Sequence, residues 1–233
     1  MSELICWICN KYDANSGEHV VKRSDLELHL GEISRANPLY RLKMDGSEGK
    51  KIYSSKNNSF KYSKTICEYC NQTLTQPHDT AWEELSRHFH SEFIRLRNKG
   101  KWNPKSVFDN CKKRMLDVHL FFLKNFGCLI KEFGYDEYID LYELSDSILN
   151  SYSNSYFFLA FGFDETGKYK LRGTISGKPI IKSLEGKVVC THYYNVGLMV
   201  VILLYSKRYR PTNFWHPDDS ENLIPFQNFG HRL

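Results

Sequence analysis

Two pairs of cysteines have the spacing of zinc ligands. Cys6 and Cys9 form one C-x2-C pair, and Cys67 and Cys70 form another. Two such pairs supply the four thiolates of a tetrahedral zinc site, and this closed shell leaves no position for water. We therefore expect one structural Zn2+ ion, with a redox role or unrelated cysteines as the alternatives. No βαβ pattern surrounds either pair, which argues against a thioredoxin-like redox site.

Three residues that could act on a substrate accompany these pairs. Glu18 and His19 lie between the pairs, and Asn71 directly follows the last cysteine. Carboxylate and amide oxygens are ligands for hard divalent cations, which can stabilise a leaving oxygen. A histidine near its ordinary pKa of about 6.5 can accept a proton from water at neutral pH. This set suits phosphodiester hydrolysis, and the alternatives are a surface role for His19 and a helix cap at Asn71.

The order of these residues resembles the HNH (ββα-metal) endonuclease superfamily. C-x2-C, then Gly-Glu-His-Val at residues 17–20, then C-x2-C-Asn before a helix, is similar to the branch with a four-cysteine zinc site that includes phage endonuclease VII. The resemblance covers about residues 1–80 and implies a zinc-stapled ββα-metal core. It implies that Glu18 and Asn71 hold a catalytic Mg2+ or Mn2+ ion and that His19 is the general base. The implied activity is metal-dependent hydrolysis of DNA.

Basic residues are distributed unevenly along the chain. The formal net charge of +5 is modest and does not by itself indicate nucleic-acid binding. Lysines and arginines are concentrated in residues 41–64, which we expect to form a mobile loop, and in residues 95–114. Each stretch alone could be a solvated surface, but their place beside the predicted metal ligands favours phosphate binding. The side chains predicted to contact DNA are Lys22, Arg23, Lys50, Lys51, Lys56 and Lys61.

Composition predicts a folded cytoplasmic protein. The N-terminus has neither the basic start nor the apolar run of a secretory signal. The longest apolar run, residues 196–205, is about half the roughly 20 residues of a membrane-spanning helix, so it predicts a buried strand and no membrane partner. In a reducing compartment, the seven cysteines do not indicate disulfides, and Cys111, Cys128 and Cys190 are expected to pack in the core.

Periodicity predicts an α+β fold in two domains. Residues 1–103 would form the HNH nuclease domain with a basic insertion, and residues 104–233 a domain of helices and an antiparallel sheet. A helix is expected from Asp79 or Thr80 to Gly100, followed by helices over about 104–126 and 136–149. Strands are expected at 156–163, 168–175, 187–194 and 197–205, the first two joined as a hairpin through residues 164–167.

The sequence leaves a second function open. A nuclease-inactive zinc-stapled module could use the same basic residues to bind nucleic acid or protein. The C-terminal half could recognise DNA, form a homodimer or bind a regulatory protein, and most of its aromatic residues suit a buried sheet better than base stacking. Restriction, phage defence or mobile-element biology would suit such a nuclease, by analogy alone.

Overall fold

The computed structural model describes residues 4–42, 51–165, 173–175, 178–184, 187–219 and 223–230. The helices are α1 (Arg23–Leu30), α2 (Gln76–Ser91), α3 (Phe93–Lys99), α4 (Cys111–Phe133) and α5 (Leu141–Leu149). The strands are β1 (Leu39–Leu42), β2 (Lys51–Ile52), β3 (Lys101–Trp102), β4 (Phe157–Phe163), β5 (Gly173–Ile175), β6 (Ile180–Leu184), β7 (Lys187–Val196), β8 (Met199–Ser206) and β9 (Ile224–Asn228).

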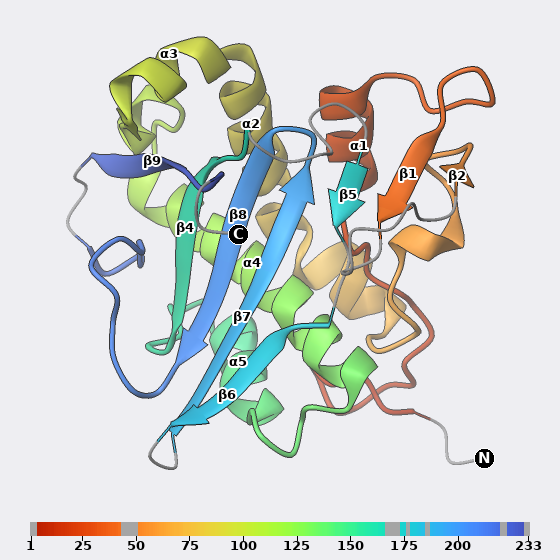
Figure 1. The fold of residues 1–233 in the computed structure, drawn as a ribbon. Coiled ribbons are helices and arrows are strands. Elements are labelled where there is room, and N and C mark those ends of the chain that lie inside the picture. The colour runs from red at the N-terminus through yellow and green to blue at the C-terminus, as the bar shows by residue number, and fades with distance from the viewer. Residues whose placement is uncertain are drawn as a thin grey trace.

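A mixed six-stranded sheet in the order β3-β9-β4-β8-β7-β6 forms the largest layer. Its pairs are antiparallel except for β4 and β9, which run parallel. Strands β2, β1 and β5 form a separate small sheet. Figure 1 shows α4 running behind the central strands, with β1, β2 and β5 at the side of the sheet next to α1.

Strand β4 and helix α4 are the most buried elements of the fold. Every residue of β4 is buried, as expected for an apolar strand covered on both faces. Gly162 allows β9 to approach β4, because a Cβ atom there would lie 2.0 Å from the carbonyl oxygen of Gln227. Helix α4 ends at Gly134, whose φ of 67° suits the left-handed conformation that closes helices.

The knuckle cysteines and the sheet share one hydrophobic core. The main cluster of buried apolar side chains runs from Cys6 to Phe226 and includes residues of α2, α4 and the sheet. Trp82 of α2 stacks on Phe121 of α4 with ring centroids 5.7 Å apart, and Tyr194 of β7 meets the same Trp82 ring edge-on. Helix α4 therefore packs both on the N-terminal part of the chain and on the sheet.

Several predicted elements are confirmed. The strands expected at 156–163, 187–194 and 197–205 correspond to β4, β7 and β8. Cys111, Cys128 and Cys190 are buried thiols, as expected for core residues. None of the helices in the described ranges is long and apolar enough to cross a membrane.

Other predictions need correction. β4 pairs with β8 and β9, and β5 pairs with β1 in parallel, so the expected hairpin of residues 156–175 is wrong. The sheet is mixed, not wholly antiparallel, because β9 returns to the edge of β4. Helix α2 begins at Gln76, before the predicted caps, and the helix expected over 104–126 begins at Cys111 and extends to Phe133. Periodicity identifies a buried face, but it does not determine which strand becomes the neighbour.

Candidate metal centre and catalytic site

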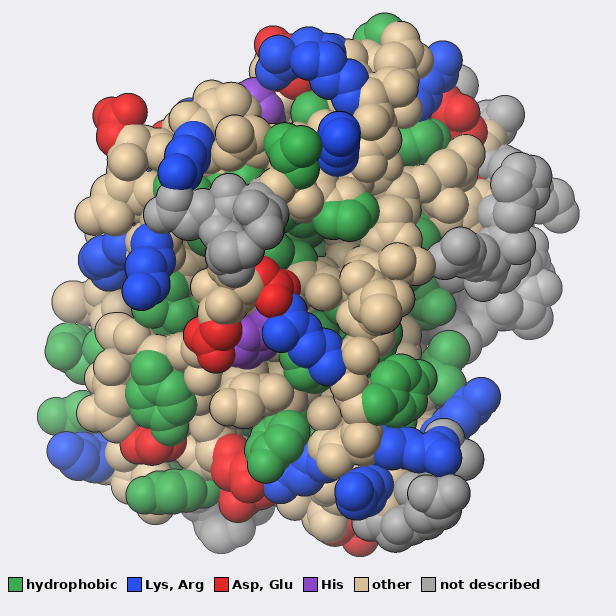
Figure 2. Space-filling view, turned by 90° about the vertical axis from the view of Figure 1, so that its left-hand side faces the viewer, with side chains coloured by type: hydrophobic (Ala, Val, Ile, Leu, Met, Phe, Trp, Pro, Cys, Tyr) green, Lys and Arg blue, Asp and Glu red, His purple; other side chains and the backbone are tan. Residues whose placement is uncertain are grey.

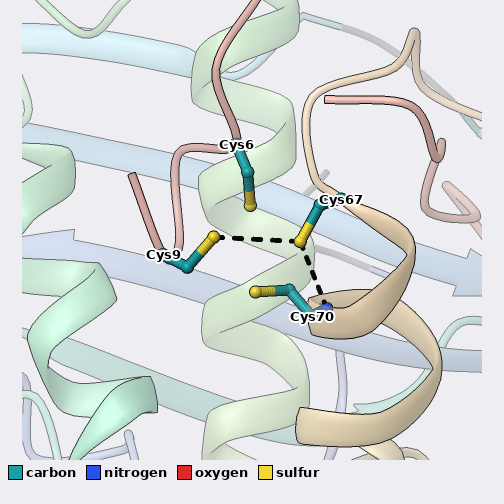
Figure 3. A group of neighbouring side chains, drawn as sticks. All are labelled: Cys6, Cys9, Cys67 and Cys70. Carbon is teal, nitrogen blue, oxygen red and sulfur yellow. Dashed lines mark hydrogen bonds between the residues drawn. The ribbon is translucent and has the colours of Figure 1, made fainter. Parts of the chain in front are cut away.

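The four predicted zinc ligands converge at one point. The Sγ atoms of Cys6, Cys9, Cys67 and Cys70 all lie within 4.8 Å of one another and point toward a common centre (Figure 3). Zn–S bonds of about 2.3 Å place the sulfurs of a tetrahedral site about 3.8 Å apart. The Cys9 and Cys67 sulfurs are separated by 3.8 Å, so the cluster has the dimensions of a four-thiolate zinc site.

Local turns present each cysteine pair to the centre. The Cys6 amide donates to Tyr12 O at 2.8 Å, and Asn10, with a φ of 51°, closes the first knuckle by donating to Cys6 O at 2.9 Å. Cys70 begins a π-helical turn (Cys70–Leu74), a feature often found at functional sites. A hydrogen bond with Cys70 lowers the pKa of Cys6 to about 5, so the cluster contains a thiolate able to bind a metal.

The first knuckle rests on helix α4. The Trp7 ring packs against Gly127 of α4. A Cβ atom on Gly127 would lie 2.3 Å from two carbon atoms of this ring, so the contact requires glycine. Trp7 Nε1 also donates to Cys128 Sγ at 3.5 Å. The first cysteine turn is therefore held in place by α4.

Residues 16–20 and 60–66 form an antiparallel ribbon between the knuckles. The Ser16 amide donates to Ile66 O at 2.9 Å, and Val20 donates to Phe60 O at 2.7 Å. Isolated bridges join Ser16 to Ile66 and His19 to Lys61. Gly17 permits this close approach, because a Cβ there would lie 2.5 Å from the carbonyl oxygen of Tyr62. Helix α2 follows the ribbon in sequence, and α1, β1 and β2 lie between the two ribbon segments.

The structure places Asn71 beside this ribbon. Its Nδ2 atom donates to Ser16 Oγ at 2.8 Å, and its backbone carbonyl accepts from Thr75 Oγ1 at 3.2 Å. Ser16 lies two residues before Glu18 in sequence, so the hydrogen bond places Asn71 against the ribbon segment that carries Glu18.

Glu18 is engaged by a buried lysine. Glu18 is 4% exposed, and its Oε2 atom lies 2.7 Å from the ammonium of Lys124, a side chain with no exposed surface. The same ammonium lies 3.1 Å from both Oδ1 and Oδ2 of Asp79. Burial is the largest single effect on the pKa of Glu18 and raises it, but the charge and hydrogen bond of Lys124, together with the His19 amide and the charge of His19, outweigh burial and lower the pKa. Glu18 is therefore a carboxylate within a buried ion pair.

This arrangement does not fit a divalent cation at Glu18. Two unit charges 4 Å apart interact by about 4 kcal/mol at an effective dielectric constant of about 20, so an ammonium and a divalent ion would repel by about 8 kcal/mol. Among the described residues, the four cysteines are the one group of three or more Cys, His, Asp or Glu whose ligand atoms converge. The order of residues in the sequence predicts a Mg2+ or Mn2+ site at Glu18 and Asn71, but the positive charge of Lys124 beside Glu18 opposes it.

His19 lies at the outer side of the ribbon. Its backbone is fixed at both ends, since its N–H donates to Glu18 Oε1 at 3.0 Å and its carbonyl accepts from Asn125 Nδ2 at 2.7 Å. The side chain is partly exposed. Burial lowers the pKa of His19, and the charges of Lys61, Lys22 and Lys124 lower it further against the opposing effect of Glu18. At neutral pH the imidazole is uncharged and can accept a proton.

The lysines and arginines predicted to bind DNA differ in their surroundings. Lys22 pairs with Asp79 at 3.2 Å and with Glu83 at 3.0 Å, and Arg23 pairs with Glu27 at 2.7 Å. Lys51 is exposed on β2, and Lys50 lies outside the described residues. Lys56 and Lys61 are exposed, and neither has an ion-pair partner in the part of the chain that the structure describes. Lys61, across the ribbon from His19, is the best-placed of the six for phosphate.

Sequence reasoning missed Lys124 and Asn125, the two α4 residues that hold the Glu18–His19 segment. Both are fully buried, and Asn125 also accepts from the hydroxyl of Tyr62 at 3.3 Å. One signal was available, because Lys124-Asn125 interrupts an otherwise apolar run from residue 120 to 130. A lysine in the middle of an apolar helical face is expected to have a buried acidic partner.

A groove on another face contains none of the predicted site residues. It encloses about 480 Å³ and is lined by residues 210–215 and 223–225 together with Asp219.

Figure 2 shows the side of the molecule on which β9 lies, where Lys and Arg side chains are interspersed with Asp and Glu. This side therefore does not present one continuous basic surface.

Comparisons with protein-family models, with curated proteins and with solved structures found no match to this chain. The functional assignment therefore depends on the residues and their geometry.

Proposed function

We propose that this protein is an endonuclease of the HNH type, which hydrolyses DNA phosphodiester bonds at His19 and uses the four-cysteine zinc site as a structural staple. The observation that carries the proposal is the placement of His19. A neutral, partly exposed imidazole lies on the ribbon between the two cysteine pairs, with an exposed lysine directly across the ribbon. A structural histidine would have no need of this combination.

The residues of the site support a division of labour. His19 accepts the proton from a water molecule as the oxygen of that water attacks the phosphorus atom. The ammonium of Lys61 stabilises the negative charge on the non-bridging phosphate oxygens. The bond to the 3′ oxygen then breaks, and the leaving oxygen takes a proton from solvent. A divalent cation, when bound, would supply a Lewis acid for the phosphate oxygens.

The test is cleavage of supercoiled plasmid and of single-stranded DNA in Mg2+, Mn2+ or EDTA. His19→Ala should cleave about 10²- to 10⁴-fold more slowly than the wild type, the usual loss for a general base, while zinc content and DNA binding remain. His90→Ala is the matched control, because His90 is exposed on α2 and lies outside the ribbon. Full activity in His19→Ala would refute the mechanism.

The second candidate is a nuclease-inactive zinc-stapled module that binds nucleic acid or protein. The ion pair between Glu18 and Lys124 favours it, since that pair removes an expected catalytic ligand. A wild-type protein that binds DNA but cleaves none of these substrates would make this the better assignment. Lys61→Ala should then weaken binding and reduce the salt dependence of the binding constant by about one counterion.

A further inference from the structure

Lys124 is the centre of a buried charged cluster beneath the predicted active site. Its ammonium joins three parts of the chain: Glu18 on the ribbon at 2.7 Å, Asp79 on α2 at 3.1 Å and the backbone of α4 that carries it. Lysine is almost never fully buried unless it is paired. Two carboxylates on different elements have thus been brought together around one positive group.

The carboxylates of this cluster are paired with ammonium groups of the protein itself. Glu18 and Asp79 contribute two negative charges, and Lys124 and Lys22 contribute two positive ones. Lys22 lies at the outer edge, where it also pairs with the partly exposed Glu83. A divalent ion placed between the two carboxylates would have to displace the ammonium of Lys124 or share their oxygens with it. Displacement would require a buried side chain to leave the core.

We infer that the ammonium of Lys124 is the resident cation of the Glu18–Asp79 pair, so that Glu18 is not free to hold the divalent metal ion that sequence order assigns to Glu18 and Asn71. Any metal used in DNA cleavage is then held by groups other than Glu18. This inference deepens the proposed function and rests on it only where it says which groups hold a catalytic metal ion. The identity of the cation beside Glu18 is a property of the folded protein, whether or not the protein cleaves DNA.

The first test measures Mn2+ binding by electron paramagnetic resonance to the full-length, zinc-loaded protein. Glu18→Gln keeps the shape of the side chain and removes its charge. Wild type and Glu18→Gln should bind Mn2+ with dissociation constants that agree within twofold, or both should fail to bind it. A loss of tenfold or more in Glu18→Gln would identify Glu18 as a metal ligand and overturn the inference.

The second test removes the ammonium. Lys124→Ala leaves both carboxylates facing a vacated space, so Mn2+ should raise its melting temperature by several degrees, as expected for a ligand that binds only the folded state. The double variant Lys124→Ala/Glu18→Gln and the control Lys131→Ala should show no rise beyond the one that Mn2+ produces in the wild type. Absence of the rise in folded Lys124→Ala would contradict the inference, and the Glu18→Gln measurement decides the matter if that variant does not fold.

Neither test uses cleavage as its readout. A wild-type protein inactive on every DNA substrate would therefore remove the proposed function and leave the assignment of Lys124 intact. Conversely, if the protein cleaves DNA and its Mn2+ binding depends on Glu18, the inference about Lys124 is refuted and the proposed endonuclease function stands.

Discussion

Two buried polar clusters hold the N-terminal part of the chain together, and they differ in where their positive charge originates. The cysteine cluster brings four thiol groups within 4.8 Å of one another and includes no basic side chain. The Glu18–Asp79 cluster brings two carboxylates together around the ammonium of Lys124. The first arrangement has ligand atoms for a cation from solution, whereas the second has its cation built into α4.

The comparison shows why ligand type and spacing alone do not identify a metal site. Both clusters contain groups that bind cations, and both are tied to α4, one through Trp7 and Gly127 and the other through Lys124. Only the charges contributed by distant residues distinguish them. Four predictions test this distinction, beginning with the largest expected effect.

Loss of a zinc ligand should abolish the fold. Cys70→Ser opens the four-thiolate shell, and structural zinc contributes about 10–16 kcal/mol in small domains, as much as the roughly 5–15 kcal/mol of total stability. We expect about one zinc per wild-type chain, and a zinc-free variant without a cooperative unfolding transition. Cys190→Ala, a buried cysteine outside the cluster, is the control and should keep its zinc. Folded wild-type protein that contains no zinc would contradict the assignment of the first cluster.

Removal of the built-in cation should cost less, but still several kcal/mol. Lys124→Met leaves the buried Glu18 without its partner and Asp79 with Lys22 alone, and breaking a buried pair in this way costs about 3–5 kcal/mol. Lys131→Met on the same helix removes a partly exposed pair with Asp136 and should cost about 0–1 kcal/mol. Urea unfolding measures both, and equal losses would show that the buried cluster has no special role.

Crowding of the contact between the first knuckle and α4 should lower the free energy of unfolding by an intermediate amount. Gly127→Ala forces a methyl group into the Trp7 ring, and overpacking of this kind costs about 1–3 kcal/mol. Zinc content should stay at one per chain, because the sulfurs are not touched. Thermal unfolding and elemental analysis of the same sample check both parts. Unchanged stability would mean that the knuckle is not anchored on α4.

Asn71 should show the smallest effect, although it is the neighbour of Cys70. Asn71→Ala removes one side-chain hydrogen bond, to Ser16, and such bonds contribute about 0.5–1.5 kcal/mol. The variant should keep its zinc, in contrast with Cys70→Ser one residue earlier. Zinc analysis and urea unfolding distinguish the two outcomes. If the variant loses zinc, then Asn71 on the π-helical turn contributes to zinc binding in addition to the four cysteines.

The sequence by itself determined the elements whose signals are local. The two C-x2-C pairs identified the four cysteines that converge, and continuous apolar runs identified β4 and β8. These predictions succeeded because ligand type, spacing and hydrophobic periodicity are properties of neighbouring residues. The candidate base His19 came from the same kind of local evidence, and its catalytic role remains a prediction.

The tertiary structure alone decided which distant groups meet. Strand β5 pairs with β1 and not with β4, because strand pairing depends on how the whole chain packs and not on the turn between two runs. Lys124 reaches Glu18 across more than a hundred residues of sequence, and this contact makes an expected metal ligand part of an ion pair. The charge state and availability of a side chain depend on burial and on the partners that the fold brings to it, which no local pattern contains.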